Sequence, residues 1–250
     1  MSKLIEFNAH PDLYKIKHLQ PRPIKYFLPD WYKKIEEHNV LKPNIKGCMP
    51  FLDGISAGYV IPLPVTVKID FNTYNDELKK NDTFCKFSFN DSRAPKDYCL
   101  KLNVNFGHVE AHGIAQVGGE NSFVSAKNKN LPILKILNPW TIKTPPGYSC
   151  LFQAPILNEN DYFHAISAIV DTDTFLDKVN FPVIINGDKY DKFDKVFESG
   201  LPLVQVIPFK RETWKHTIGE HKEDWTWLNT YYTRILNRYK SFSWNKKKWT

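Results

Sequence analysis

Hydrophobic and polar residues alternate along much of this chain with the two-residue period of β-strands. Residues 65–70 read Val-Thr-Val-Lys-Ile-Asp, and residues 100–106 read Leu-Lys-Leu-Asn-Val-Asn-Phe. Because successive side chains of a strand point to opposite faces, each segment has one apolar and one polar face. Both segments therefore predict half-buried strands that pack on a core.

The stretch from residue 138 to residue 211 repeats this pattern in short units. β-Branched and aromatic runs alternate there with Pro, Gly, Asn and Asp at a spacing of about 8–12 residues, which is typical of all-β sandwiches and barrels. We therefore expect a mainly β fold with an antiparallel core that is a sandwich, a jelly roll or barrel-like. The three alternatives stay open, because strand pairing in such folds is non-local.

Two helices are expected beside the β core. The first covers about residues 29–38, with Pro29 and an aspartate in its first turn and with Trp31, Ile35 and, as a further candidate, Tyr32 on its buried stripe. The second covers residues 223–239, where aromatic and aliphatic residues recur at steps of three and four.

The second helix sets the expected domain limits. Residues 1–222 are predicted to form a single β-rich domain, and residues 223–250 a C-terminal helix followed by an aromatic and lysine-rich tail.

Composition and charge favour a globular protein and argue against several functional classes. The 250 residues are 42% hydrophobic and 14% aromatic, which is ample for a buried core. The net charge of +7 comes from dispersed lysines, without the basic stripe of a nucleic-acid protein, so nucleic acid is an unlikely partner. The four cysteines contain no C-x-x-C pair, which disfavours a zinc finger or redox dithiol. No signal pattern or apolar run of about 18 residues is present, so we expect a soluble protein without a membrane partner.

One short segment has the residue types of a metal site. On a strand, His108, Glu110 and His112 would face the same side and offer two imidazoles and a carboxylate. Such a set suits a divalent metal, namely Zn, Fe or Mn, in a cupin-like enzyme or small-molecule binder. The alternative is a solvated strand end, because Gly107 and Gly113 can bend the strand away.

A second candidate site combines Asp171 and Asp173 with Gln205. The order of Asp-x-Asp, strand, Gly and an apolar run around Gln weakly resembles the sugar-binding and closing strands of the dUTPase β-fold. That resemblance implies a nucleotide hydrolase, although an Arg-Ser-Gly turn and a glycine-rich phosphate-binding tail are both missing. The plainer alternative is that the two aspartates accept hydrogen bonds from backbone amides in a turn.

Large aromatic residues are the candidates for interface anchors, because interfaces are enriched in them. The alternative role for most of them is to fill the core. The candidates are Trp140, Tyr148, Trp225, Trp227, Trp244 and Trp249.

Several phrases together resemble an uncharacterised protein family of T4-like phages of marine bacteria, chiefly cyanophages. The phrases span nearly the whole chain: residues 28–34, 48–54, 57–61, 116–119, 140–152, 170–173, 179–182 and 205–211, with His112 and the aromatic-lysine tail. Members of that family are usually described as hypothetical or virion structural proteins, without catalytic residues to transfer. His112 fits the shared pattern better than His108 or Glu110, which weakens the three-ligand metal site.

The resemblance implies a phage virion-associated structural or interaction protein without catalytic activity. Its partners would be other phage proteins or further copies of itself, in the host cytoplasm during infection or in the virion. The metal-dependent enzyme and the dUTPase-like hydrolase remain the alternatives.

Overall fold

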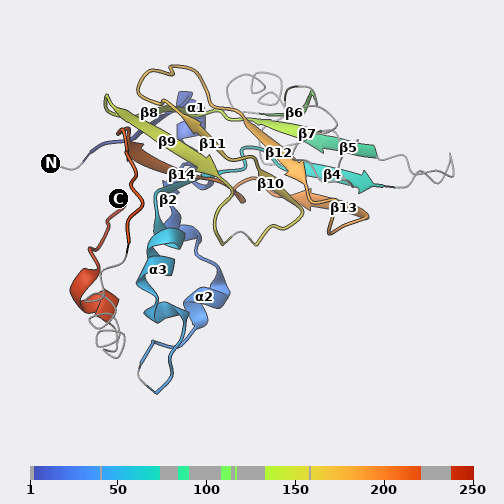
Figure 1. Ribbon diagram of the computed structural model, residues 1–250. Coiled ribbons are helices and arrows are strands. Elements are labelled where there is room, and N and C mark those ends of the chain that lie inside the picture. Colours follow the sequence, from blue (N-terminus) through green and yellow to red (C-terminus); the bar gives the residue numbers. More distant parts are fainter. Residues whose placement is uncertain are drawn as a thin grey trace.

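A computed structural model describes residues 3–39, 41–73, 84–89, 108–113, 116, 133–157, 159–220 and 238–250 (Figure 1). Within these residues the protein is mainly β, with four antiparallel sheets and a few short helices. This confirms the predicted fold class, and the arrangement is sandwich-like. In the described part of the chain none of the four sheets closes into a barrel.

The largest sheet has five strands and carries the features that matter for function. In spatial order its strands are β11 (Ala168–Val170), β9 (Tyr148–Gln153), β14 (Pro202–Lys210), β3 (Tyr59–Pro62) and β2 (Arg22–Pro23). The central strand β14 pairs with β9 on one side and with β3 on the other. Gly58, at φ +72°, lets β3 approach β14, because a Cβ there would collide with the carbonyl oxygen of Val206.

Three smaller sheets complete the β structure. The four-stranded sheet runs β10 (Phe163–Ala165), β12 (Phe181–Ile185), β7 (Ile133–Leu137) and β6 (His108–His112). The three-stranded sheet runs β13 (Lys192–Phe197), β4 (Val67–Asn72) and β5 (Phe84–Phe89). The two-stranded sheet pairs β1 (Glu6–Asn8) with β8 (Thr141–Lys143).

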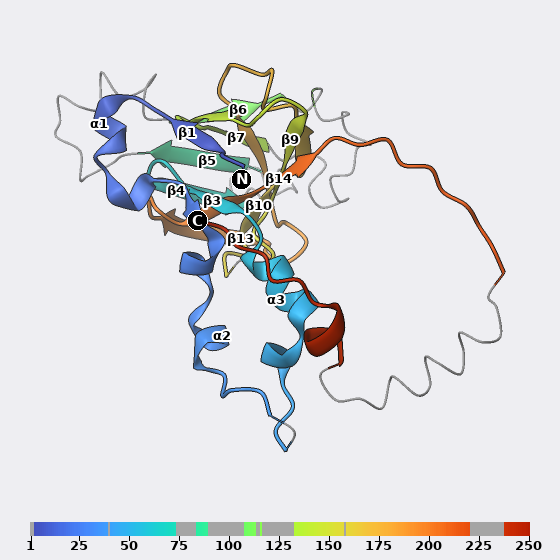
Figure 2. The ribbon, with the colours of Figure 1, turned by 90° about the vertical axis from the view of Figure 1, so that its left-hand side faces the viewer.

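The described helices are short. They are α1 (Pro11–Tyr14), η1 (Lys17–Leu19), η2 (Ile24–Phe27), α2 (Asp30–Lys34), η3 (Ile45–Gly47), α3 (Met49–Ser56) and the π-helical turn η7 (Tyr239–Ser243). Helices α2 and α3 lie together on one side of the sheets, and η7 lies close to α3 (Figures 1 and 2).

The predicted first helix is shorter than expected, and only part of its predicted buried stripe is buried. It ends at Lys34 rather than near residue 38, because Ile35 is already extended with φ −58° and ψ 136°. Tyr32 is buried at 5% exposure, whereas Trp31 is 48% exposed, so the predicted buried role of Trp31 is wrong. The predicted helix over residues 223–239 lies almost entirely outside the described residues.

One continuous hydrophobic core draws side chains from all four sheets. In β4, Val67, Ile69 and Phe71 are buried at 0–2% exposure and alternate with more exposed neighbours, as the sequence pattern predicts. Burying one such side chain contributes roughly 1.5–3 kcal/mol. Among the described helices none is long and apolar enough to cross a membrane.

Candidate functional site

Arg211 lies where the chain leaves the large sheet at the end of β14. Its guanidinium contacts the carboxylate of Asp173 at two points, with Nη1–Oδ1 at 2.7 Å and Nη2–Oδ2 at 2.5 Å. Nη1 also donates to the Ser149 hydroxyl and to the Tyr148 carbonyl, both at 3.1 Å, and lies 3.2 Å from Oδ1 of Asp171. The Ser149 hydroxyl in turn donates to Oδ1 of Asp171 at 2.6 Å. Two-point contact between a planar guanidinium and a carboxylate fixes the orientation of Arg211.

The turn before β9 locks the same corner through backbone contacts. Gly147 has φ +83° and follows two prolines, the pattern of a type II turn in which glycine is favoured. Its N–H donates to Oδ2 of Asp173 at 2.8 Å, and its carbonyl accepts from the N–H of Arg211 at 2.8 Å. We call Arg211, Asp173, Asp171, Ser149 and Gly147 the arm anchor.

The Arg211 and Asp173 side chains of the arm anchor stabilise each other in their charged forms. The hydrogen bonds from Arg211, and then the N–H of Gly147, lower the pKa of Asp173 to about 2. The bond to Asp173 likewise raises the pKa of Arg211. The Asp173 side chain is only 5% exposed, whereas that of Arg211 is 37% exposed, so the carboxylate is shielded and the guanidinium faces solvent. The pair therefore remains intact at neutral pH.

The hydroxyl and thiol at this corner are sealed from solvent. Ser149 and Cys150 are both 0% exposed. Burial raises the pKa of the Cys150 thiol to about 11, and its sulfur accepts a hydrogen bond from Thr172 at 3.3 Å. At neutral pH neither side chain presents a nucleophile to a substrate.

The structure brings Asp171 and Asp173 together but keeps Gln205 apart. Gln205 precedes Arg211 by six residues in β14, or about 20 Å of extended chain. Its fully buried amide accepts from the N–H of Ile156 at 3.2 Å and donates to the carbonyls of Gly54 at 3.2 Å and Ala57 at 2.8 Å. Gln205 thus fastens the end of α3 to the sheet. Asp173 accepts a hydrogen bond from the backbone N–H of Gly147 in the turn before β9, as the plainer alternative in the sequence analysis expected.

The proposed metal-site residues lie on β6, as predicted, at the edge of the four-stranded sheet. Glu110 forms an ion pair with Lys135 of the neighbouring strand. Burial, and then Lys135, lowers the pKa of His112, so its imidazole is neutral at neutral pH. Among the described side chains no group of three or more His, Cys, Asp and Glu gathers to hold a metal ion. The side chain of His108 lies outside that description, so the Zn, Fe or Mn site stays a prediction.

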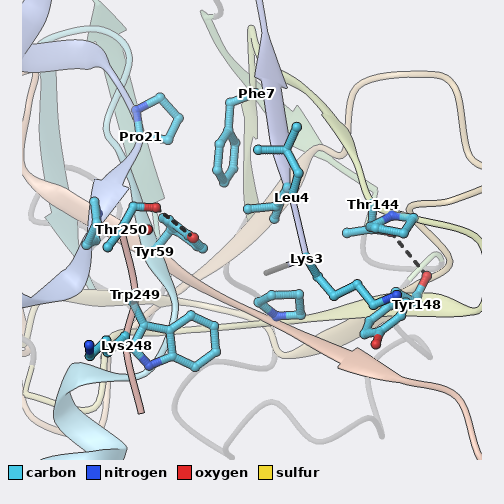
Figure 3. Close-up of a pocket in the computed structure, with 14 residues that line it drawn as sticks. Lys3, Leu4, Phe7, Pro21, Tyr59, Thr144, Tyr148, Lys248, Trp249 and Thr250 are labelled. Atoms are coloured by element: carbon cyan, nitrogen blue, oxygen red, sulfur yellow. Dashed lines mark hydrogen bonds between the residues drawn. The ribbon is translucent and has the colours of Figure 1, made fainter. Parts of the chain in front are cut away.

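A groove of about 600 Å³ opens beside the arm anchor (Figure 3). Residues from the two ends of the sequence line it together with the turns of the large sheet. They are Lys3, Leu4, Ile5, Phe7, Pro21, Pro23, Tyr59, Thr144, Pro145, Tyr148, Pro208, Lys248, Trp249 and Thr250. None of these described lining residues is Asp or Glu, and two are lysines, so the charged side chains of this aromatic and proline-rich groove are positive.

Opposite walls of the groove come from opposite ends of the chain. Figure 3 shows Lys248, Trp249 and Thr250 on one side, with Lys3 and Tyr148 on the other. The ammonium of Lys3 lies 5.7 Å from the centre of the Tyr148 ring, a cation–π contact. The ring of Trp249 meets that of Tyr59 edge-on at 6.1 Å.

The C-terminal tail is fastened to the body by polar contacts. Asp53 of α3 accepts from Nε1 of Trp244 at 3.0 Å and from Nζ of Lys247 at 2.7 Å. The hydroxyl of Tyr59 donates to the carbonyl of Thr250, and Nζ of Lys25 donates to the carbonyl of Trp249, both at 3.2 Å. These contacts, which we call the tail latch, hold one wall of the groove in place.

The predicted interface aromatics lie in different parts of the molecule. Trp140 is 3% exposed in the core, so its predicted role as a surface anchor is wrong and the core alternative holds. Tyr148 and Trp249 line the groove, and Trp244 belongs to the tail latch. Trp225 and Trp227 lie outside the described residues.

Beyond the arm anchor the chain continues as an extended, solvent-exposed segment. Residues 212–220, which we call the arm, run away from the body of the protein, drawn in orange in Figure 2. Trp214 is 85% exposed and Ile218 is 93% exposed. The sequence analysis missed both, together with Lys3 and Tyr59. The sequence signal that could have identified the arm is the pair of apolar residues Trp214 and Ile218 in an otherwise polar segment directly after the strand at residues 202–210.

Comparisons with known proteins do not identify a family. No family model matches the chain, and no curated protein matches it. Among solved structures, a mutant dUTPase from the S. aureus phage phi11, described with a structural Mg(II) ion, is 11% identical. The match covers 48% of this chain and 99% of that one at a TM-score of 0.25, so it carries no argument about function.

Proposed function

We propose that this protein is a structural or interaction protein of a phage particle that acts by binding other proteins rather than by catalysis. The observation that carries the proposal is the arm. Two large apolar side chains, Trp214 and Ile218, stand almost fully in solvent on a segment that projects from the large sheet. Aromatic residues presented in this way are the usual anchors of protein interfaces.

The arm anchor supports this proposal physically. A flexible peptide loses conformational freedom when it binds, whereas a segment with a fixed root loses less. Arg211 fixes the root through Asp173, Asp171 and Ser149. The same contacts occupy the polar side chains that a catalytic site at this corner would need.

The phage context is proposed from the resemblance of several phrases of the sequence to the marine phage family. In that context the partners are other phage proteins or further copies, met in the host cytoplasm and retained in the particle.

Quantitative peptide mass spectrometry of gradient-purified particles of the source phage tests the proposal. We expect a copy number in fixed ratio to the capsid or tail proteins. The double variant Trp214→Ala/Ile218→Ala should reduce incorporation at least about fivefold. The matched control is Leu41→Ala, because Leu41 is also 93% exposed but lies far from the arm in sequence. Abundance in infected cells with absence from particles would overturn the proposal.

A further inference from the structure

We infer that the partner of the arm is a second copy of this chain, and that the arm of one copy binds in the groove of the next. This inference rests on the proposed interaction function and deepens it by naming the partner. It connects two features that the fold places at one corner: the arm leaves the sheet at Arg211, and the groove includes Tyr148, which contacts Arg211.

The direction of the arm favours another molecule over its own groove. The Arg211 guanidinium is held by Asp173, Asp171 and Ser149, and its backbone N–H by Gly147. The arm therefore continues outward from β14. In Figure 2 it runs from the end of β14 away from the body and into solvent. To enter its own groove it would have to reverse direction directly after this fixed point.

The apolar faces of the arm and the groove match. Alternate residues of a β-strand share a face, so Trp214, His216 and Ile218 would point to one side if the arm binds as a strand. The groove offers the rings of Tyr59 and Trp249. Its volume of about 600 Å³ lies within the range of roughly 300–1,000 Å³ that holds compact organic groups. An indole with a neighbouring aliphatic side chain suits such a space.

The charges match as well. The described groove residues include Lys3 and Lys248 but no carboxylate side chain. The apolar pair of the arm lies between Glu212 and Glu220, with Lys215 as the cation between them, and Glu212 forms an ion pair with Lys210 at 2.6 Å. Attraction between the carboxylate of Glu220 and the lysines of the groove favours binding of the arm there.

The reach of the arm makes exchange between copies feasible. Its nine residues span about 30 Å when extended at about 3.3 Å per residue. Reciprocal exchange between two copies would close a two-fold dimer, and sequential exchange would build an open chain. Both assemblies use the same contact.

The first test is the oligomeric state of the full chain by analytical ultracentrifugation. We expect concentration-dependent association that Trp214→Ala/Ile218→Ala weakens at least about tenfold, while Leu41→Ala leaves it unchanged. A monomer throughout the accessible range, or association that the double variant does not alter, would overturn the inference.

The second test locates the contact. A photo-crosslinking phenylalanine analogue replaces Trp214, and ¹⁵N-labelled and unlabelled chains are mixed before illumination. Crosslinks between heavy and light chains that join the arm to peptides around Tyr59, Tyr148 or Trp249 would support exchange. Crosslinks confined to one isotope, or to peptides away from the groove, would overturn it.

The two proposals fail in different ways. If the protein is present in particles but its arm crosslinks to another phage protein, the interaction function stands and the self-partner is wrong. If the protein is absent from particles but forms arm-in-groove oligomers, the phage-particle function falls and the self-contact stands.

Discussion

Replacing Gln205 with leucine tests whether this residue holds the fold together. The side chain is 0% exposed and makes three hydrogen bonds to backbone groups of Ile156, Gly54 and Ala57. Leucine has a similar volume but makes none of them, so two carbonyls and one N–H lose this partner. At about 1 kcal/mol for each bond, Gln205→Leu should lower the free energy of unfolding by about 2–3 kcal/mol. For a chain of this size that corresponds to a fall in Tm of about 5–10 °C.

The assay is urea unfolding monitored by tryptophan fluorescence, with Tm from calorimetry. The matched control is Gln153→Leu, the same change at the cross-strand neighbour of Gln205, whose side chain is only half-buried. The control should change the free energy of unfolding by less than about 0.5 kcal/mol. If Gln205→Leu also stays within that limit, the assigned structural role is refuted.

Three further predictions concern the arm anchor, the thiols and the tail. Because the folded pKa of Asp173, about 2, lies below its ordinary value of 3.8, its ion pair stabilises the fold above about pH 4, and this stabilisation is lost as the pH falls through 2. In acid titrations Asp173→Asn should be less stable than the parent at pH 7, and the difference in stability should close toward pH 2; a difference that does not change with pH would contradict this assignment. A thiol reagent should label exposed Cys48 in the native protein but reach buried Cys150 only after unfolding, as read by mass spectrometry of the labelled peptides; native labelling of Cys150 would count against its burial. Asp53→Ala removes the two contacts that Asp53 makes with Trp244 and Lys247 in the tail latch, and it should speed tryptic cleavage within residues 244–250 at least about fivefold. An unchanged rate would show that Asp53 does not hold the tail.

The sequence predicted the β character of the protein well because strand periodicity is a local signal. The alternation over residues 65–70 matches the burial of Val67 and Ile69 in β4, and HVEAH forms β6 as expected. The helix at Asp30 was predicted at the right place, but its predicted length was too great. It ends at Lys34 because the backbone of Ile35 is extended.

Contacts between residues far apart in the sequence could not be predicted from local patterns. Arg211 meets Asp173 across 38 positions, and Trp244 meets Asp53 across 191. Burial also decides between the roles of identical residue types: Trp140 and Trp249 were grouped together as anchors, yet one fills the core and the other lines the groove. Periodicity does not distinguish them, because both depend on where remote strands come to lie.

The construction of the groove has a consequence for the order of events during synthesis. One wall contains Lys3 and the other Trp249, so the first and last described parts of the chain must both be in place before the groove exists. Chains are made from the N-terminus at about 5–20 residues per second, so residues 248–250 are the last part of the groove to be made. A chain therefore lacks a complete groove until these residues have reached the body of the protein. Under the arm-exchange mechanism, a chain can receive the arm of another copy only after that step.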